Sequence, residues 1–210
     1  MKVISCVQRS PEWYQARLGR LTASCAAEAF AAIKSGEAAS RRNLRMRLVL
    51  ERLTGVSQEN GYHSSDMDRG IELEAAAYAA YEAHTGILVE PIGFVAHDEL
   101  LAGCSPDGLT ADGLIEIKCP KASTHLNYLL GGLPLEYRTQ ITMSLWLTGA
   151  QWGDFVSFHP DFPEPLRLKV TRLYAKDLDL AAHELNVRLF LTECDREIAA
   201  LQALAKTVLM

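Results

Sequence analysis

Apolar positions in the first 86 residues recur at the three- and four-residue spacing of amphipathic helices. Ser10, Pro11 and Glu12 predict a helix start, because a hydroxyl cap, an early proline and an acid in the first turn favour one. We expect Gly19 to end this helix. Three further helices are predicted: residues 24–36, capped by Ser24, residues 39–54, closed by Gly55, and residues 66–85, closed by Gly86.

The helix predicted over residues 39–54 has two chemically different sides. Its pattern places Leu44, Leu48 and Leu53 on one side and Arg41, Arg45 and Arg52 roughly opposite.

After Gly86 the pattern changes to short, glycine-bounded runs rich in strand-forming residues. Such a succession of helices and strands is typical of a mixed α/β domain. Since no repeat or Pro/Gly-rich linker interrupts the chain, one domain over residues 1–210 is expected. The predicted strands cover residues 87–90, 93–96, 101–105, 114–119, 151–158 and 166–174, and further helices cover 123–131, 134–148 and 176–207.

Composition narrows the class of protein. Hydrophobic residues make up 49% and charged residues 22% of the chain, as in ordinary globular proteins. No apolar run approaches the ~20 residues that span a bilayer, and the first residues lack a secretory pattern, so a cytoplasmic protein is expected. The five cysteines are scattered without a C-x-x-C pair, which argues against a disulfide framework, a zinc ribbon or a clustered iron–sulfur site.

The net charge of −5 conceals an uneven distribution. Residues 1–52 hold ten basic and four acidic residues, a balance of +6, whereas residues 53–116 hold one and twelve, a balance of −11. A solvated acidic face accounts for most of these carboxylates. A few of them converging on a metal, with the basic segment holding a polyanion nearby, is the alternative interpretation.

Three residues carry the candidate chemistry. Side chains alternate along a strand, so Glu116 and Lys118 share one face, and Ile115, Ile117 and Cys119 share the other. Asp107 precedes Glu116 by nine residues, beside a turn made by Pro106 and Gly108, so a hairpin brings it to the same face. Carboxylates and the Ile117 carbonyl suit Mg²⁺, with Mn²⁺ as a substitute, and a lysine beside them suits phosphodiester hydrolysis. An ordinary Glu/Lys pair on a surface hairpin is the alternative.

Two flanking helices offer further polar groups. Glu72 and Glu74 lie within an alanine-rich helix, from which an acid can reach a metal. A solvated face is the preferred interpretation for Glu72. Gln140 lies among apolar neighbours and is either a surface residue or a ligand for phosphate or water.

Taken together, the motifs resemble the phage lambda-type exonucleases, the alkaline-exonuclease or viral-recombinase family of the PD-(D/E)XK nuclease superfamily. The resemblance spans most of the chain, and five motifs in order make it specific. They are W-x-x-x-R-x-G-x-x-T-A-S from Trp13 to Ser24, Gly70-x-x-x-Glu74, Ser105-Pro-Asp-Gly with Glu116-Ile-Lys-Cys-Pro, Leu130-Gly-Gly, and Gln140-x-x-x-Ser-x-Trp146.

The resemblance implies a restriction-endonuclease-like core: a central mixed sheet flanked by helices, preceded by N-terminal helices. Residues 57–210 would form the catalytic core, and residues 1–56 would contribute to binding a DNA end. The implied roles are metal ligation by Asp107, Glu116, Ile117 and Glu74, catalysis by Lys118 and Gln140, and binding of a DNA 5′-phosphate by Arg17, Ser24 and Ser105.

Some positions depart from the family pattern or match it loosely. Thr142 replaces a second glutamine of some members, and Asp98 lies near a position that is acidic in relatives. Thr22 also matches, although its hydroxyl can serve to cap the following helix. Trp13 and Trp146 are expected in the core.

The family implies a Mg²⁺-dependent 5′-to-3′ exodeoxyribonuclease that digests one strand of linear double-stranded DNA and leaves a 3′ overhang. It further implies a ring-shaped homotrimer, a single-strand annealing protein as partner, and a phage or prophage protein acting in the bacterial cytoplasm. The alternatives are an endonuclease of the same superfamily, for restriction or junction cleavage, and a non-catalytic DNA-end-binding module that loads an annealing protein.

Overall fold

The structure is a computed structural model that describes residues 1–58 and 65–208. Its strands form two four-stranded sheets, each containing both parallel and antiparallel pairs. The mixed α/β fold class is therefore confirmed, with its strands shared between two sheets. The first sheet has the order β1 (Lys2–Ile4), β3 (Phe94–Ala96), β4 (Ala102–Cys104), β2 (Leu21–Thr22), and the second β5 (Gly108–Leu109), β6 (Gly113–Lys118), β7 (Trp152–Phe158), β8 (Leu168–Tyr174).

The helices begin and end largely where the sequence predicts. The Ser10 hydroxyl accepts a hydrogen bond from the Trp13 amide at the start of α1, and Gly19, Gly55 and Gly86 take left-handed conformations after the predicted helices. The α-helices are α1 (Pro11–Arg17), α2 (Ala26–Ala29), α3 (Ala39–Thr54), α4 (Ser65–Thr85), α5 (Ala122–Gly131), α6 (Leu135–Thr148) and α7 (Leu180–Val208); short 3₁₀ turns cover Ala23–Cys25, Glu164–Leu166 and Ala175–Asp177.

Some predicted boundaries are wrong. The second helix, α2, stops at Ala29, and Ser24 lies inside the preceding 3₁₀ turn without capping it. The segment 87–90 makes only an isolated bridge, between Glu90 and Leu109. Strands β1 and β2 were not predicted, because strands of two or three residues are too short for alternation to be recognised.

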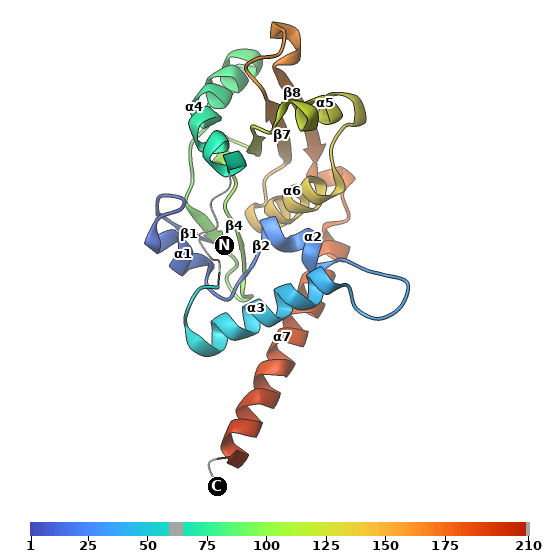
Figure 1. The fold of residues 1–210 in the computed structure, drawn as a ribbon. Coiled ribbons are helices and arrows are strands. Elements are labelled where there is room, and N and C mark those ends of the chain that lie inside the picture. Colours follow the sequence, from blue (N-terminus) through green and yellow to red (C-terminus); the bar gives the residue numbers. More distant parts are fainter. Residues whose placement is uncertain (59–64, 209–210) are drawn as a thin grey trace.

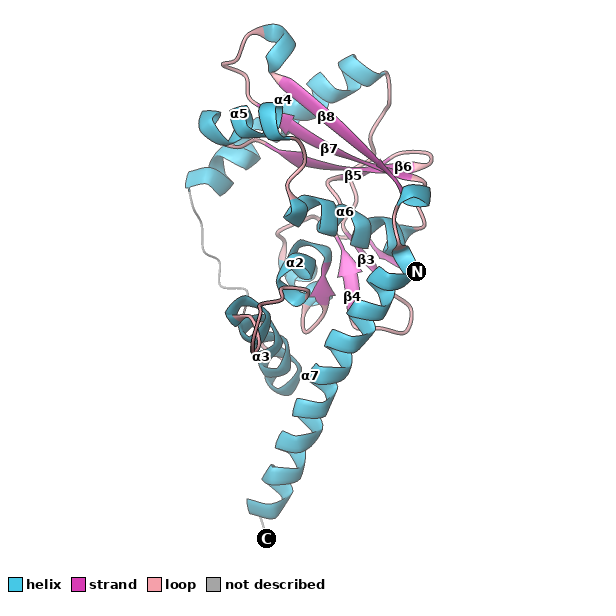
Figure 2. Cartoon of the chain, turned by 90° about the vertical axis from the view of Figure 1, so that its right-hand side faces the viewer, coloured by secondary structure: helices cyan, strands magenta, loops and turns pink. Residues whose placement is uncertain are grey.

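Strand β6 is buried between two helices, which accounts for its alternation. Ile115, Ile117 and Cys119 pack against α4 through Ala77 and Tyr81. On the opposite face, Leu114 packs against Ile141 and Leu145 of α6. Because Glu116 and Lys118 share the face of Leu114, they point toward the α6 side of the sheet. Figure 2 shows α6 lying between the two sheets, with which it makes contact on both sides.

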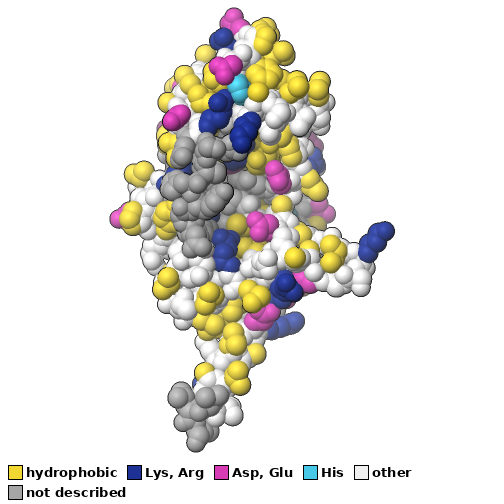
Figure 3. Space-filling model, viewed as in Figure 1, with side chains coloured by type: hydrophobic (Ala, Val, Ile, Leu, Met, Phe, Trp, Pro, Cys, Tyr) yellow, Lys and Arg dark blue, Asp and Glu magenta, His cyan; other side chains and the backbone are white. Residues whose placement is uncertain are grey.

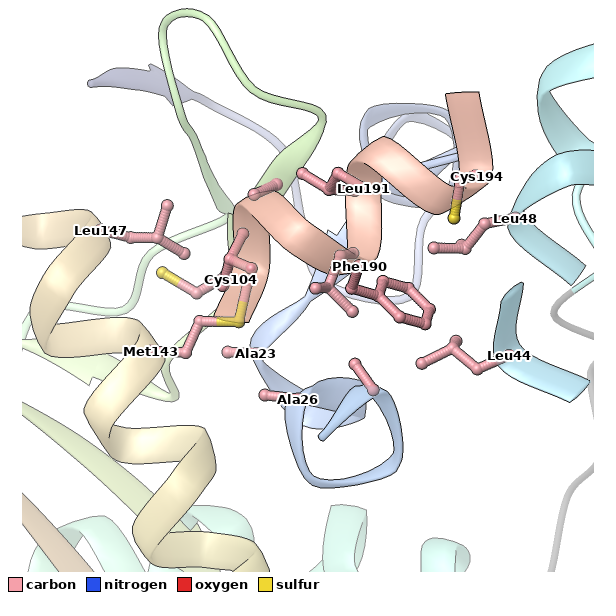
Figure 4. Packing of buried hydrophobic residues seen from close by; sticks show 14 of the residues in the cluster. Ala23, Ala26, Leu44, Leu48, Cys104, Met143, Leu147, Phe190, Leu191 and Cys194 are labelled. Carbon is pink, nitrogen blue, oxygen red and sulfur yellow. The ribbon is translucent and has the colours of Figure 1, made fainter. Parts of the chain in front are cut away.

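A second core joins α2, α3, α6 and α7 to the first sheet. Phe190 and Leu191 of α7 pack with Leu44 and Leu48 of α3, and Met143 of α6 closes the cluster, as Figure 4 shows. This core anchors the first sheet, which carries the residues just before Asp107.

The prediction that the arginines of α3 lie opposite its leucines is wrong, because at 3.6 residues per turn they fall on the side of Leu44 and Leu48. Arg41 and Arg45 form ion pairs with Glu37, Glu193 and Glu197, and Arg52 pairs with Asp195. Leu53, in contrast, is exposed. These arginines pair with carboxylates of α7 and of the preceding loop, which makes them poor candidates for holding a polyanion.

Helix α7 runs well past α3 at its C-terminal end (Figures 1 and 2). Leu201 and Leu204 on this projecting part are 45% and 60% exposed, and hydrophobic side chains are visible there in Figure 3. No helix within the described residues has the length and apolar character needed to cross a membrane.

Candidate active site

The β5–β6 pairing places Asp107 beside Glu116. Gly108 lies opposite Ile115, and the Asp107 amide donates a 3.1 Å hydrogen bond to the Ile115 carbonyl. The Asp107 carboxylate in turn accepts a 2.6 Å hydrogen bond from the Ile117 amide. The N–H and C=O of one residue point to the same side of a strand, so the Ile117 carbonyl lies on the edge of β6 that faces Asp107. Asp107, Glu116 and the Ile117 carbonyl therefore lie side by side, as the sequence predicted.

Lys118 forms an ion pair with Glu116 on the shared face of β6. Its ammonium nitrogen lies 2.5 Å from the Glu116 carboxylate and 5.3 Å from the centre of the Tyr137 ring. Burial lowers the pKa of Lys118, but the charges of Glu116 and Asp107 outweigh that effect and raise the pKa above its usual value. The side chain is therefore a cation at neutral pH.

Asp107 lies in an environment that disfavours its charged form. Burial, followed by the charge of Glu116, raises the pKa of this carboxyl above its usual range, against the opposing effect of Lys118. A divalent cation bound between these two carboxylates would offset their mutual repulsion.

Helix α4 brings Glu74 toward the same site. The Tyr78 hydroxyl, one helical turn further along, donates a hydrogen bond to the Asp107 carbonyl. Burial and then the charges of Asp107, Glu74 and Glu116 raise the pKa of the Tyr78 hydroxyl. Glu72 is exposed, which agrees with the solvated helix face that the sequence favoured for it.

Helical spacing puts Gln140 on the face of α6 that carries Tyr137 and Ser144. It is three residues after Tyr137, which lies near Lys118, and four before Ser144, whose hydroxyl interacts with Cys104. Gln140 is partly buried. Thr142 points elsewhere, because its hydroxyl donates to the Arg138 carbonyl of its own helix at 2.7 Å.

Arg17, Ser24 and Ser105 belong to one chain of contacts. The Trp13 indole donates a 2.7 Å hydrogen bond to the Ser105 hydroxyl, and the Arg17 guanidinium lies 4.1 Å from the centre of the Trp13 ring. Arg17 also lies 3.5 Å from the Thr22 hydroxyl, which is 3.2 Å from that of Ser24. The predicted phosphate-binding residues are therefore together, and Ser105 connects them to Asp107 two residues later.

Several residues of the site were missed or misplaced by sequence reasoning. Trp13 is only partly buried and joins the Arg17 cluster, where a core position was expected. Tyr78 and Tyr137 carry no sequence signal beyond their helical spacing from Glu74 and Gln140. Trp146 does pack against the second core, and Asp98 lies outside the site, where it pairs with the amino terminus.

The donors at the site are of one chemical kind. Asp107 and Glu116 offer carboxylate oxygens, and the Ile117 carbonyl adds a backbone oxygen. Within residues 1–58 and 65–208, no three acidic, histidine or cysteine side chains form a complete cation cage. Mg²⁺ commonly keeps several waters and binds one or two carboxylates, so this oxygen donor set fits it.

Comparison with known proteins identifies the family. A model described as the YqaJ-like viral recombinase domain matches residues 12–151, which include both clusters. The chain belongs to this viral recombinase family. A comparison with curated protein sequences found no match.

Solved structures extend the family assignment. The crystal structure of an alkaline exonuclease, LHK-Exo, from Laribacter hongkongensis has 39% sequence identity and a TM-score of 0.84, over 95% of this chain and 100% of that one. LHK-Exo in complex with dAMP gives a TM-score of 0.86 at the same identity and coverage. A phage-related exonuclease from Haemophilus somnus 129PT, with 12% identity and a TM-score of 0.68 over 87% of this chain and 96% of that one, shares the fold. The resemblance to lambda-type exonucleases is confirmed.

Proposed function

We propose that this member of the viral recombinase family is a Mg²⁺-dependent exonuclease that digests the 5′-ended strand of linear double-stranded DNA and leaves a 3′ single-stranded overhang. The observation that carries this proposal is the direct connection between two clusters. Asp107, Glu116 and Lys118 can hydrolyse a phosphodiester, and Arg17, Ser24 and Ser105, reached through Pro106, can hold a terminal phosphate.

The carboxylates of Asp107 and Glu116 and the carbonyl of Ile117 would hold the cation, and Glu74 would join them once its carboxylate leaves Arg9. When bound, Mg²⁺, or Mn²⁺ in its place, would lower the pKa of a coordinated water and offset charge on the phosphate. The Ile117 amide fixes the orientation of Asp107, so this ligand is positioned before the substrate arrives.

Lys118 and Gln140 would act on the reacting groups directly. The Lys118 ammonium, held by Glu116, can donate hydrogen bonds to the attacking water and to a phosphate oxygen as negative charge develops there. Gln140, on the face of α6 that carries Tyr137, can orient the water or the phosphate with its amide group.

The cluster of Arg17, Ser24 and Ser105 supports digestion from the 5′ end. A guanidinium presents a planar fork to phosphate oxygens, and stacking on Trp13 keeps it oriented. The hydroxyls of Ser24 and Ser105 add donors to the same anion. A pocket for a terminal phosphate has no use in an endonuclease that cuts within a duplex, so this cluster favours an exonuclease.

Assembly and partners extend the proposal. We propose a ring-shaped homotrimer, because a chain of 210 residues is too small to encircle a duplex alone, and the exposed apolar residues of α7 offer surface for association. A single-strand annealing protein as partner and action in the bacterial cytoplasm, as a phage or prophage product, rest on the family assignment.

The test is digestion of linear duplex DNA, labelled on one end, in Mg²⁺. Substrates with 5′-phosphate and 5′-hydroxyl ends are compared with closed circular duplex. Loss of label from the 5′-ended strand only, faster with phosphate and absent on circles, is the expected result. Cutting of closed circles would indicate an endonuclease. Binding of DNA ends without turnover in Mg²⁺ or Mn²⁺ would indicate a non-catalytic module that loads an annealing protein.

A further inference from the structure

Arg9 has an unusual backbone conformation. Its φ of 69° is the one positive value at a non-glycine residue in the described parts of the chain. The left-handed region is disfavoured for side chains with a Cβ atom and is mostly taken by glycine, asparagine or aspartate. Such a residue persists only where its surroundings impose the conformation, and such residues cluster at functional sites.

The turn that contains Arg9 is fixed at both of its ends. The Gln8 side-chain amide donates hydrogen bonds to the carbonyls of Ile92, at 2.9 Å, and Pro106, at 3.0 Å. The Ser10 amide donates to the Val7 carbonyl at 3.1 Å, and the Ser10 hydroxyl caps α1. The turn is thereby held between α1, which carries Arg17, and the residue that precedes Asp107.

The Arg9 guanidinium lies at the edge of the carboxylate site. One of its nitrogens is 3.5 Å from the carboxylate of Glu74, which lies one helical turn before Tyr78, the residue whose hydroxyl donates to the Asp107 carbonyl. The side chain is 48% exposed. An ion pair that is both long and half-exposed contributes little to stability, so contact with Glu74 does not account for a strained arginine here.

The charge around the site calls for a cation at this edge. Three carboxyl groups, those of Glu74, Asp107 and Glu116, gather at the site, and the Lys118 ammonium is already paired with Glu116. A DNA strand that approaches them brings further negative charge. A half-exposed guanidinium beside Glu74 can donate two parallel hydrogen bonds to a phosphate, in the planar geometry that arginine favours.

We infer, building on the proposed nuclease function, that Arg9 binds a backbone phosphate of the strand being cut, on the carboxylate side of Ser105. The left-handed backbone sets the direction of the side chain, and the bonds of Gln8 hold that direction. In the free protein the Arg9 guanidinium contacts the Glu74 carboxylate, and when DNA binds a phosphate takes the place of that carboxylate.

The test uses Arg9→Gly, because glycine accepts this φ and the variant therefore keeps the fold. A contact present in both the ground state and the transition state changes KM and leaves kcat nearly unchanged. We expect KM for 5′-phosphorylated linear duplex to rise about tenfold, with a smaller rise in Arg9→Lys, which retains the charge. Lys34→Gln, which removes one positive charge from an exposed position of the loop before α3, is the matched control and leaves KM unchanged.

Binding provides a second readout that does not need turnover. In a Lys118→Ala background, which prevents cutting, we measure the affinity for a duplex end by fluorescence anisotropy over a range of salt concentrations. Loss of one phosphate contact reduces the slope of log affinity against log salt by about 0.7 to 0.9. The control variant in the same background keeps the full slope.

The outcomes separate the two proposals. If wild type digests linear duplex but Arg9→Gly has the wild-type KM and salt slope, Arg9 contacts no phosphate and the inference is overturned. A reduced melting temperature of Arg9→Gly with an unchanged slope also overturns it, because it indicates a purely structural role. If wild type itself digests no DNA, the nuclease proposal fails, and the salt slope of end binding still decides the role of Arg9.

Discussion

The Ile117 amide donates a 2.6 Å hydrogen bond to the Asp107 carboxylate, so that a strand of the second sheet positions an acid from the turn before it. This bond uses one carboxylate oxygen and leaves the other for a cation. It also orients Asp107 toward Glu116, at the cost of bringing two like charges together.

Replacing Asp107 by asparagine separates its charge from its shape. Asp107→Asn retains an oxygen for the Ile117 amide but loses the negative charge that holds a cation. We expect digestion to fall at least about a hundredfold, and the rise in melting temperature on adding Mg²⁺, which reports binding to the folded state, to disappear.

The same variant changes stability without metal. The folded protein raises the pKa of Asp107, so its charged form opposes folding; this destabilisation is absent below the ordinary pKa of 3.8, grows between that value and the raised pKa, and is complete above it. Metal-free Asp107→Asn is therefore expected to be more stable than wild type at alkaline pH, by on the order of 1 kcal/mol. Urea unfolding in a chelator measures it, and a less stable variant would contradict it.

Removing the Lys118 ammonium should affect turnover far more than DNA binding. We expect Lys118→Ala to digest linear duplex about a hundredfold or more slowly, because it loses the group that stabilises developing charge. Circular dichroism checks that the fold survives the loss of the Glu116 ion pair. The matched control is Lys34→Ala, at an exposed position of the loop before α3, and a wild-type rate in Lys118→Ala would exclude a catalytic role.

The end preference should depend on the shape of the Arg17 side chain. Arg17→Lys keeps the charge but loses the planar fork and the stacking on Trp13. We expect the ratio of kcat/KM for 5′-phosphate over 5′-hydroxyl ends to fall by about tenfold. Arg188→Lys, in an exposed pair with Glu184 on α7, is expected to leave the ratio unchanged. An unchanged ratio in Arg17→Lys would assign Arg17 to structure.

Removing Asp154, the centre of a hydrogen-bond network in the second sheet, should strongly destabilise the protein. Asp154 is fully buried, accepts two hydrogen bonds from Arg172 at 2.8 and 2.7 Å, and accepts one from Tyr81 at 2.7 Å. Asp154→Ala leaves both partners unsatisfied, and we expect the free energy of unfolding to fall by about 3–5 kcal/mol. Asp161→Ala, at an exposed carboxylate, is the control and changes it by less than about 0.5 kcal/mol.

His183 should make the protein acid-sensitive. Its side chain is 7% exposed, its Nε2 atom has no hydrogen-bond partner among the described residues, and burial lowers the pKa of the imidazole to about 4. The unfolded chain thus binds the proton first, so stability is full above the ordinary pKa of 6.5 and declines as pH falls toward 4. We expect His183→Leu to remove about 1–3 kcal/mol of that decline. Equal acid sensitivity of variant and wild type in urea unfolding would refute this.

The elements that sequence patterns predicted best are those with strong local determinants. The alternation of residues 114–119 correctly placed Ile115 and Ile117 in the core and Glu116 with Lys118, because β6 is covered by a helix on each face. Glycines ended three helices where expected because the left-handed turn that follows a helix favours glycine.

What the sequence could not show depends on contacts between distant segments. The arginines of α3 form ion pairs with carboxylates of α7, some 150 residues later, and these partners cannot be read from the sequence of α3. Trp13 was expected in the core, but it is partly exposed and donates a hydrogen bond to Ser105, a partner 92 residues away. The left-handed backbone of Arg9 has no local signal, because it is imposed by Ile92 and Pro106 through the bonds of Gln8.

The passage from β4 to β5 has a consequence for the size of the product. Only Pro106 separates Ser105 from Asp107, and a two-residue span covers at most about 7 Å, comparable with the separation of neighbouring phosphates in one strand. If Ser105 holds the DNA end and Asp107 acts at the cut bond, as proposed, the buried, φ-restricted proline would fix the distance between them. Each cut would then release a single nucleotide. A residue inserted beside Pro106 would lengthen this span and change the step with which the enzyme advances along DNA.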